Sequence, residues 1–272
     1  MDRITRARLS YRQIHRIGSQ AINKVSPIPK SATVSEVREA ELDAILSNFE
    51  NDTIFVHAGL SDIRSAFGKN PYKFLLNKLS ENFQNVLAPG FTSTYRRSGV
   101  YHKKFSRPEH GMFNQLFLSD ADYRTDDAIH SILVKGEYRF SDCDHHDTFG
   151  ESSCWNKLDR ENIPHLNIGT GRLRCFPLHY IENKYDLPYN EVTEYEGVIY
   201  YSESEYKRIS QTSYDYSQKV RWNRKKIKSY LEKEGALKDH SVNGLRIYSF
   251  YTRDTREALL PQIDNDPYYL VV

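Results

Sequence analysis

The pattern of hydrophobic and polar positions predicts helices and strands that alternate along the chain. Apolar residues recur at helical spacing from Val34 through Leu42 and Leu46, and the short apolar run at residues 53–56 is typical of a buried strand. The pattern predicts, in chain order, a helix over 34–46, a strand over 53–56, a helix over 71–83, a strand over 86–88, a helix over 111–118 and strands over 131–134, 165–168 and 198–200.

The last quarter of the chain continues this alternation. A charged amphipathic helix is predicted over 216–234, ended by Gly235, followed by a strand over 245–248 and a helical turn over 255–260. Strands that alternate with helices indicate an α/β fold. Residues 1–34 are basic and polar, so we expect an N-terminal extension there and a single catalytic domain over residues 35–272.

Composition and charge exclude several classes of protein. The 38 Lys and Arg residues against 36 Asp and Glu give a net charge of +2, which offers no general attraction for nucleic acid or membrane. No apolar run approaches the length of a membrane span or a signal peptide. Cys143, Cys154 and Cys175 have no metal-binding spacing and are expected as reduced core residues, so we expect a cytoplasmic globular protein.

The first candidate for catalysis is a histidine followed by a carboxylate. Pro177 can open a helix, and His179 and Glu182 then lie at i and i+3 on one face. A histidine oriented by a carboxylate is a common general base, because the partner fixes its tautomer. A surface His–Glu pair with no catalytic role explains the spacing equally well.

A second candidate is the end of the predicted strand at residues 53–56. His57, Ala58, Gly59, Leu60 and Ser61 follow it, and small residues there would expose backbone N–H groups at the carboxyl edge of a sheet, where α/β proteins bind ligands. Taken alone, the segment is more readily explained as an ordinary connection between a strand and a helix.

Two further clusters of polar residues could form binding sites, but their spacing favours a structural explanation. Asp144, His145, His146 and Asp147 are ligand types for a divalent metal, but adjacent residues on a loop rarely all face one ion, which favours a solvated loop. The basic residues of 221–228, interleaved with Trp222, could meet a phosphate, although their spacing favours a solvated helix face.

Segments spread over residues 38–272 resemble, in order, those of the aminoglycoside 3-N-acetyltransferase family. Residues 52–61 resemble the family's strand that ends in Val-His-Ser-Ser-Leu-Ser. Further segments are similar as follows: residues 88–92 to Met-Pro-Thr-Phe-Thr, 106–117 to the Pro-Ser-x-Met-Gly segment and its helix, 124–136 to Arg-Ser-x-His-Pro-x-x-Ser, 149–153 to Phe-Gly-x-Gly-Ser-Pro, and 169–182 to a glycine-ended strand followed by Thr-x-Leu-His-x-x-Glu.

The resemblance implies a central mixed β-sheet flanked by helices and an N-acetyltransferase that takes its acetyl group from acetyl-CoA without a metal. The family's catalytic pair falls on His179 and Glu182. The implied coenzyme-binding residues are His57, Ala58, Gly59, Leu60, Ser61 and Ser106. The implied substrate-binding residues are Thr92, Asp127, His130 and Ser131.

The chain departs from the family's pattern at positions near these residues. Phe176 stands where the family has a Thr, three residues before the histidine, and this removes a hydroxyl donor. In this chain, Asp127-Ala128 replaces the family's His-Pro, Ala58 and Gly59 replace its two Ser, and His110 replaces its Met. A hydrogen-bond donor to a developing oxyanion stabilises the transition state by about 2.7–4 kcal/mol, which is what loss of the Thr hydroxyl can remove. Together, the departures argue against the family's usual antibiotic substrate more than against its chemistry.

The partners expected are therefore CoA and a small amino sugar, which is free, antibiotic-like or nucleotide-linked; a homodimer stays open. Polycationic aminoglycosides require an acidic pocket, for which Asp126, Asp127, Glu191 and Glu194 are candidates. One alternative is a catalytically degenerate relative that binds CoA or a sugar in polysaccharide biosynthesis. The other is a metal-dependent hydrolase built on residues 144–147.

Overall fold

The computed structural model describes residues 32–272, and the chain divides into two units, residues 1–39 and residues 40–272. Most of the predicted N-terminal extension, residues 1–34, lies outside the described residues, so the boundary between residues 34 and 35 stays a prediction. The predicted first helix is present as α2 (Ala32–Leu46). Within residues 32–272 no helix is long and apolar enough to cross a membrane.

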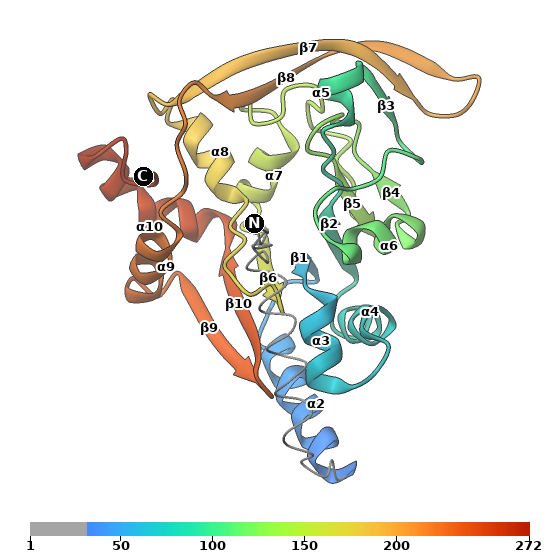
Figure 1. The fold of residues 1–272 in the computed structure, drawn as a ribbon, viewed down its shortest axis with the longest axis vertical. Helices are drawn as coiled ribbons and strands as arrows, with labels where there is room; N and C mark the ends of the chain where they lie inside the picture. The colour runs from blue at the N-terminus through green and yellow to red at the C-terminus, as the bar shows by residue number, and fades with distance from the viewer. Residues whose placement is uncertain (1–31) are drawn as a thin grey trace, which may run out of the picture. The chain divides into compact units, whose positions relative to one another are not determined.

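Residues 40–272 are built on a seven-stranded mixed sheet in the order β4-β5-β2-β1-β6-β10-β9 (Figure 1). Strand β1 lies at its centre, parallel to both β2 and β6, while the other neighbours pair antiparallel. The carboxyl ends of β1, β2 and β6 therefore meet at one edge. The strands are β1 (Thr53–Ala58), β2 (Asn85–Pro89), β4 (Tyr123–Arg124), β5 (Ile132–Lys135), β6 (Pro164–Ile168), β9 (Leu237–Val242) and β10 (Leu245–Tyr251).

Helices cover both faces of this sheet because its central strands are apolar on both sides. Along β1, Ile54 and Val56 pack into one core with α2, α3, α4 and α6, whereas Phe55 points to the opposite face, where α7 and α8 pack. A further core joins α8, α9 and α10 to β9 and β10. The helices are α3 (Leu60–Phe67), α4 (Pro71–Asn82), α5 (Thr94–Ser98), α6 (Met112–Asp120), α7 (Cys154–Arg160), α8 (Pro177–Lys184), α9 (Arg224–Lys233) and α10 (Thr252–Asn265).

A second sheet of three strands, in the order β3-β7-β8, stands beside α5 and α8 (Figure 1). Strands β7 (Asn190–Tyr200) and β8 (Tyr206–Tyr216) form a long antiparallel hairpin, and β3 (Val100–His102) pairs parallel to β7. Tyr95, Tyr101 and Ile199 form its own small core. The hairpin carries residues of β8 to the face of α8, which positions part of the site described below.

The structure confirms the predicted α/β class and most predicted elements, with three corrections. The helix predicted over 216–234 is wrong in its first half, because β8 runs to Tyr216 and α9 begins only at Arg224. Helix α3 was not predicted: it begins at Leu60, within the segment expected to connect the first strand to a helix. The last helix is longer than predicted and continues through Pro261.

Candidate active site

His179 and Glu182 lie on the same face of α8, as their spacing predicts. Helix α8 begins at Pro177, whose fixed backbone angle suits the first helical position and whose missing N–H costs nothing there. Nδ1 of His179 lies 3.2 Å from Oε2 of Glu182. The carboxylate is fully buried, whereas the His179 side chain keeps 32% exposure, so the pair joins the protein interior to an open surface.

Glu182 is held by three further donors. The indole Nε1 of Trp222 donates to Oε1 at 2.6 Å, the Tyr189 hydroxyl donates to Oε1 at 3.2 Å, and the Tyr216 hydroxyl donates to Oε2 at 3.1 Å. Burial, reinforced by the Glu182 carboxylate, raises the pKa of both tyrosines, so the phenols keep their protons and donate. Together with His179, these donors offset the cost of burying the carboxylate.

Trp222 is placed by the C-terminal end of the chain. Trp222 forms an isolated antiparallel bridge with Val271, and the backbones of Arg221 and Val272 exchange hydrogen bonds. The same indole lies 4.4 Å from the imidazole of His179, measured between ring centroids. The C-terminal residues therefore fix a side chain that contacts both members of the His–Glu pair.

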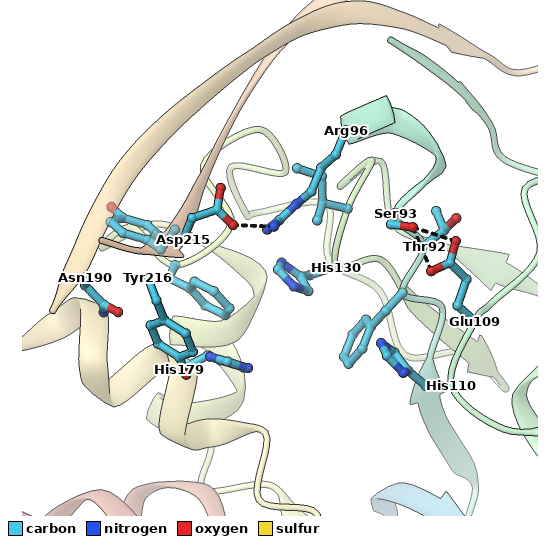
Figure 2. A pocket seen from close by; sticks show the side chains of 14 residues that line it. Thr92, Ser93, Arg96, Glu109, His110, His130, His179, Asn190, Asp215 and Tyr216 are labelled. Carbon is cyan, nitrogen blue, oxygen red and sulfur yellow. Dashed lines mark hydrogen bonds and ion pairs between the residues drawn. The ribbon is translucent and has the colours of Figure 1, made fainter. Parts of the chain in front are cut away.

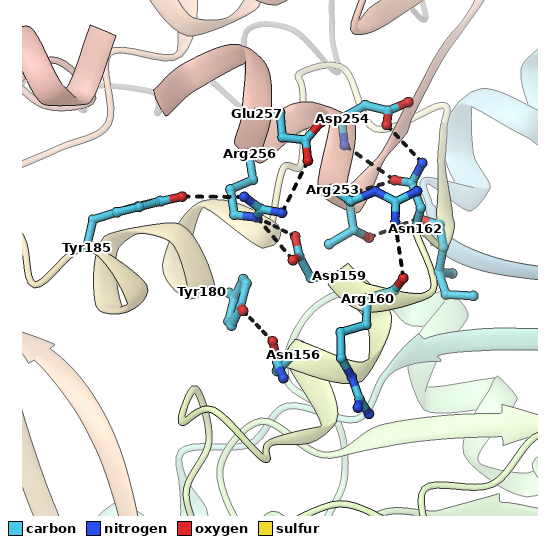
Figure 3. Close-up of polar contacts among 12 residues, drawn as sticks. Asn156, Asp159, Arg160, Asn162, Tyr180, Tyr185, Arg253, Asp254, Arg256 and Glu257 are labelled. Carbon is cyan, nitrogen blue, oxygen red and sulfur yellow. Dashed lines mark hydrogen bonds and ion pairs between the residues drawn. The ribbon is translucent and has the colours of Figure 1, made fainter. Parts of the chain in front are cut away.

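Helix α8 is also anchored from the opposite side by α7 and α10 (Figure 3). The Tyr180 hydroxyl donates to Oδ1 of Asn156 on α7 at 2.6 Å. On α10, the Arg256 guanidinium bonds both oxygens of Asp159 through Nε, at 2.9 and 3.0 Å, and its Nη1 lies 3.4 Å from the hydroxyl of Tyr185 just beyond α8. These contacts limit movement of the helix that carries His179.

A cavity of about 360 Å³ opens in front of His179 (Figure 2). Its volume is near the lower end of the roughly 300–1,000 Å³ usual for small-molecule sites. One side comes from α8 and the hairpin, and the other from the segments that follow β2 and precede α6. The lining residues are Phe91, Thr92, Ser93, Arg96, Glu109, His110, Ile129, His130, Phe149, His179, Asn190, Tyr214, Asp215 and Tyr216.

Each carboxylate that lines the cavity is paired with an arginine. Nη1 of Arg96 on α5 binds Oδ1 of Asp215 on β8, and the two lie together at the roof in Figure 2. On the other side, Glu109 accepts hydrogen bonds from the Ser93 hydroxyl at 2.8 Å and from Nη2 of Arg97 at 3.1 Å. The cavity therefore combines a largely apolar and aromatic lining with fixed charges that compensate one another.

Two other histidines of the cavity are held neutral. Burial, with smaller contributions from His179, Arg96 and His110, lowers the pKa of His130 well below its usual value, and burial likewise lowers the pKa of His110. Nδ1 of His130 is buried without a hydrogen-bond partner among the described residues. A neutral imidazole with an unused nitrogen is suited to bind a hydroxyl or an amide of a ligand.

Phe176 lies behind His179 in an aromatic cluster. Its ring centroid is 4.9 Å from that of His179, 4.1 Å from Phe91 and 4.5 Å from Trp155. The residue fills space with apolar contacts and offers no donor, so the hydroxyl expected from the family's Thr is replaced here by packing.

The four predicted substrate-binding residues divide into two pairs. Thr92 and His130 line the cavity. Asp127 and Ser131 do not: both are buried, Asp127 accepts the backbone N–H groups of Ile129 and His130, and Ser131 donates to the carbonyl of Gly90. Their hydrogen-bonding groups are used inside the protein, so the structure places them beneath the cavity, and a role in substrate binding stays a prediction.

The predicted coenzyme-binding loop lies where β1 ends and α3 begins. The Gly59 N–H donates to the carbonyl of Ile168 at 2.8 Å and is therefore engaged. A Cβ on Gly59 would lie 1.9 Å from the Gly169 oxygen, which explains why a glycine replaces the family's Ser. The N–H groups of Leu60 and Ser61 open α3 and have no partner within that helix.

His57, at the end of β1, has an unused buried nitrogen. Its Nε2 finds no hydrogen-bond partner among residues 32–272, and burial, with Arg174 and His110 adding, lowers its pKa to about 3. Gly111 connects this loop to the cavity, because a Cβ there would lie 3.9 Å from the carbonyl of Ala58 and the preceding His110 lines the cavity.

Ser106, the remaining predicted coenzyme contact, is engaged in its own turn. Its hydroxyl accepts the N–H of His102 at 2.9 Å, and its carbonyl accepts Nη1 of Arg124 at 2.7 Å. Arg124 is itself buried and also bonds the carbonyls of Lys103 and Gly90. The structure thus places Ser106 in a supported loop and not on the cavity lining.

The loop of residues 144–147 uses its polar groups locally. Nδ1 of His145 accepts the N–H of Asp126 and Nε2 lies 2.8 Å from the carbonyl of Phe140, while Asp144 and Asp147 accept backbone N–H groups of the same loop. In the described part of the chain, no three His, Cys, Asp or Glu residues are grouped as metal ligands. The geometry therefore lends no support to the hydrolase alternative.

Several residues of the site carry no signal in the sequence. Arg96, Asp215 and Tyr216 meet only because the hairpin places β8 opposite α5, and the pair Arg96–Asp215 is separated by 119 positions in the chain. The charge pattern around Trp222 favours a solvated helix face. The hydrogen-bond partner of the Trp222 indole is Glu182, which lies 40 positions away in the chain.

Comparison with solved structures identifies the fold. The chain is similar to the YokD protein from Bacillus subtilis, with 14% identity, a TM-score of 0.66 and coverage of 89% of this chain and 96% of that one. It is similar to AAC-IIIb in a binary complex with CoASH, with 15% identity, a TM-score of 0.65 and coverage of 85% of this chain and 96% of that one. It is also similar to a mutant of the aminoglycoside acetyltransferase AAC(3)-IVa in complex with a gentamicin, with 15% identity, a TM-score of 0.63 and coverage of 86% of this chain and 90% of that one. None of the curated protein sequences compared with the chain matches it.

The chain therefore has the α/β fold that these solved structures share. The sequence model of the aminoglycoside 3-N-acetyltransferase family matches residues 76–260, and the chain belongs to this family. It is accordingly an N-acetyltransferase whose acyl donor is acetyl-CoA.

Proposed function

We propose that this protein transfers the acetyl group of acetyl-CoA directly to an amine of an amino sugar, with His179 as the general base and Glu182 as its partner. The observation that carries the proposal is the position of His179, which lines the cavity while its Nδ1 bonds a fully buried carboxylate. A base in a cavity with a fixed tautomer is what acetylation of an amine requires.

The Glu182 carboxylate determines which tautomer His179 adopts. An ionised Glu182 only accepts hydrogen bonds, so Nδ1 of His179 carries the proton and Nε2 keeps its lone pair. Nε2 takes a proton from the substrate amine as the amine nitrogen attacks the thioester carbonyl. The tetrahedral intermediate then collapses with cleavage of the carbon–sulfur bond, and the imidazolium returns the proton to the leaving thiolate.

The segment of residues 57–61 is proposed to hold the thioester end of acetyl-CoA. The N–H groups of Leu60 and Ser61 open α3 and point to the carboxyl edge of the sheet, where the helix dipole favours developing negative charge. The unused Nε2 of His57 offers a further polar contact. Because the Gly59 N–H already donates to the Ile168 carbonyl, Gly59 offers acetyl-CoA no donor. Its lack of a side chain instead lets the ligand come close to the backbone.

The acceptor is proposed to lie against Thr92 and His130 on the side of the cavity facing His179. Aromatic rings beside a few polar side chains, in a compact volume, suit a sugar ring that carries an amine. The proposal leaves open whether the sugar is free, linked to a nucleotide or part of an antibiotic.

The proposal is tested by thiol release from acetyl-CoA with a panel of amino sugars and aminoglycosides. His179→Ala is expected to lower kcat by about 10²–10⁴-fold, the usual contribution of a general base. Glu182→Gln keeps the shape of the partner but removes its charge, and we expect a smaller loss. Full acetyl transfer by His179→Ala would overturn the assignment of the base.

The degenerate alternative has one observation in its favour, the Phe at position 176 where the family has a Thr donor. It predicts that calorimetry detects binding of acetyl-CoA while no amine of the panel releases thiol. Thiol release that depends on an amine and on His179 removes this alternative.

A further inference from the structure

The fixed charges of the cavity cancel in pairs. Arg96 is matched by Asp215, and Glu109 is matched by Arg97, which is largely exposed and does not line the cavity. Burial alone would raise the pKa of Glu109, but hydrogen bonds from Ser93 and the charge of Arg97 lower it, so the carboxylate is ionised and already compensated. An incoming ammonium group therefore meets no carboxylate on the cavity lining that lacks a cationic partner.

The oxygens of these carboxylates are also occupied. Asp215 has Oδ1 bound by Arg96 and Oδ2 bound by the hydroxyl of Tyr195. Arg96 is held in turn, because its Nη2 donates to Oγ of Ser213 at 3.0 Å and its guanidinium lies 5.4 Å from the ring of Tyr195. Pulling Asp215 away to meet a ligand would leave Arg96, whose side chain is three-quarters buried, without its counter-charge.

The acidic residues expected from the sequence to form a pocket for a polycation lie elsewhere. Asp126 is paired with Lys103 and the hydroxyl of Tyr201, and Asp127 is buried in its own turn. Glu194 bonds Ser210 on the hairpin, and Glu191 is exposed. None of these four lines the cavity.

We propose that the acceptor of this enzyme carries a single amine and little positive charge, and that Arg96, by neutralising Asp215, is the residue that disfavours acceptors with several ammonium groups. This inference rests on the proposed function and narrows its substrate class. A one-amine sugar must bind as the neutral amine to attack the thioester, so it carries no positive charge into the chemical step. A multi-amine substrate retains its other charges, and each must be placed beside Arg96 or the compensated carboxylates.

The substrate class is tested on the full-length enzyme with three probes of increasing charge: glucosamine with one amine, 2-deoxystreptamine with two, and gentamicin with several. Thiol release gives kcat/KM for each. We expect kcat/KM to fall along this series, with glucosamine exceeding gentamicin by at least about tenfold at low ionic strength, where charge effects are least screened. A higher kcat/KM for gentamicin than for glucosamine would overturn the inference and leave the proposed acetyl transfer intact.

Arg96→Gln tests the residue itself. Removal of the guanidinium leaves Asp215 unpaired and available, so the ratio of kcat/KM for gentamicin to that for glucosamine should rise at least about tenfold. Arg208→Gln, the same substitution at an exposed position of β8 outside the cavity lining, is the matched control and should leave the ratio unchanged. An equal ratio in Arg96→Gln and wild type would contradict the role of Arg96.

A binding measurement separates this inference from the proposed function. Calorimetry of gentamicin with wild type, Arg96→Gln and the double variant Arg96→Gln/Asp215→Asn requires no turnover. We expect the affinity to rise in Arg96→Gln and to fall again in the double variant, which has lost both charges. If no amine releases thiol, the proposed function fails, and the order of these affinities still supports or refutes the charge argument. A melting curve for each variant verifies that it is folded.

Discussion

The indole of Trp222 donates a hydrogen bond of 2.6 Å to the buried carboxylate of Glu182. The indole also contacts the imidazole that Glu182 orients, with ring centroids 4.4 Å apart. Trp222 is thus a positioning residue of the proposed catalytic pair, supplied by a segment that the C-terminal residues hold in place.

Trp222→Phe keeps an aromatic ring beside His179 but removes the donor. We expect kcat to fall about tenfold or more, because a hydrogen bond to a charged group contributes about 1.5–3 kcal/mol and Glu182 would keep only its two tyrosines and His179. The measurement is kcat and KM by thiol release. A change in KM alone, with kcat and its pH profile unaltered, would mean that Trp222 acts on binding and not on the His–Glu pair.

Gly59→Ala tests the close approach of the β1 and β6 ends. The backbone of Gly59, at φ −108°, accepts any residue, so the cost is the clash of the new Cβ with the carbonyl of Gly169. Overpacking of this kind costs about 1–3 kcal/mol, and the backbone clash puts this variant at the upper end. Urea unfolding measures it.

Gly171→Ala is the matched control for that substitution. Gly171 has φ +66°, but a Cβ added there would meet no atom within 4 Å, so only the left-handed backbone is penalised, by about 1–2 kcal/mol. A loss of stability for Gly59→Ala no larger than for Gly171→Ala would contradict the packing of the two strand ends.

Asp127→Asn tests the buried turn beneath the cavity. Burial raises the pKa of Asp127 to about 6, above its ordinary 3.8 in the unfolded chain. Its contribution to stability is therefore full below about pH 4 and is lost as the pH rises through 6. The shift corresponds to roughly 3 kcal/mol, so Asp127→Asn, which keeps an acceptor for Ile129 and His130, should be more stable than wild type at pH 8 by up to that amount.

Asp126→Asn gives the opposite sign at the neighbouring position. Burial alone would raise the pKa of Asp126, but Lys103 and Tyr201 lower it, so its ionised form stabilises the fold at neutral pH. We expect this variant to be less stable than wild type at pH 8. Denaturant unfolding of both variants between pH 4 and pH 8 measures the difference, and equal behaviour of the two would refute the distinct environments of these carboxylates.

Arg256→Met tests the support of α8 by α10 shown in Figure 3. It leaves Asp159, with its side chain 5% exposed, buried without its partner, and loss of one member of a buried pair costs about 3–5 kcal/mol. Arg253→Met, on the same helix, loses only a 3.3 Å bond to a backbone carbonyl and should cost far less. Melting temperatures of the two variants compare them directly.

Local patterns in the sequence are sufficient to predict α8 and the strands β1, β2, β5, β6 and β10 of the central sheet, but not its outer strands β4 and β9. The apolar run that forms β1 and the Pro177 start of α8 are short-range signals, and helical spacing alone places His179 beside Glu182. The hairpin is not predictable in this way. Only the apolar end of β7, residues 198–200, gives a local strand signal, and the charged segment after β8 resembles a continuous helix.

The walls of the cavity depend on contacts between segments that are distant in the chain. Arg96 meets Asp215, and Trp222 meets Glu182, only after the hairpin and the C-terminus have packed, so no spacing rule relates them. Asp127 and Ser131 show the opposite case: the family resemblance points to their segment, but burial turns their polar groups inward.

The central claim is that the imidazole of His179 carries the proton in acetyl transfer. Its most direct test is thiol release by His179→Ala, saturated with acetyl-CoA and an amino-sugar acceptor, in the absence and presence of added imidazole. We predict that kcat falls by about 10²–10⁴-fold and that free imidazole, which fits the space left by the ring, restores part of it. Undiminished activity without imidazole would contradict the account.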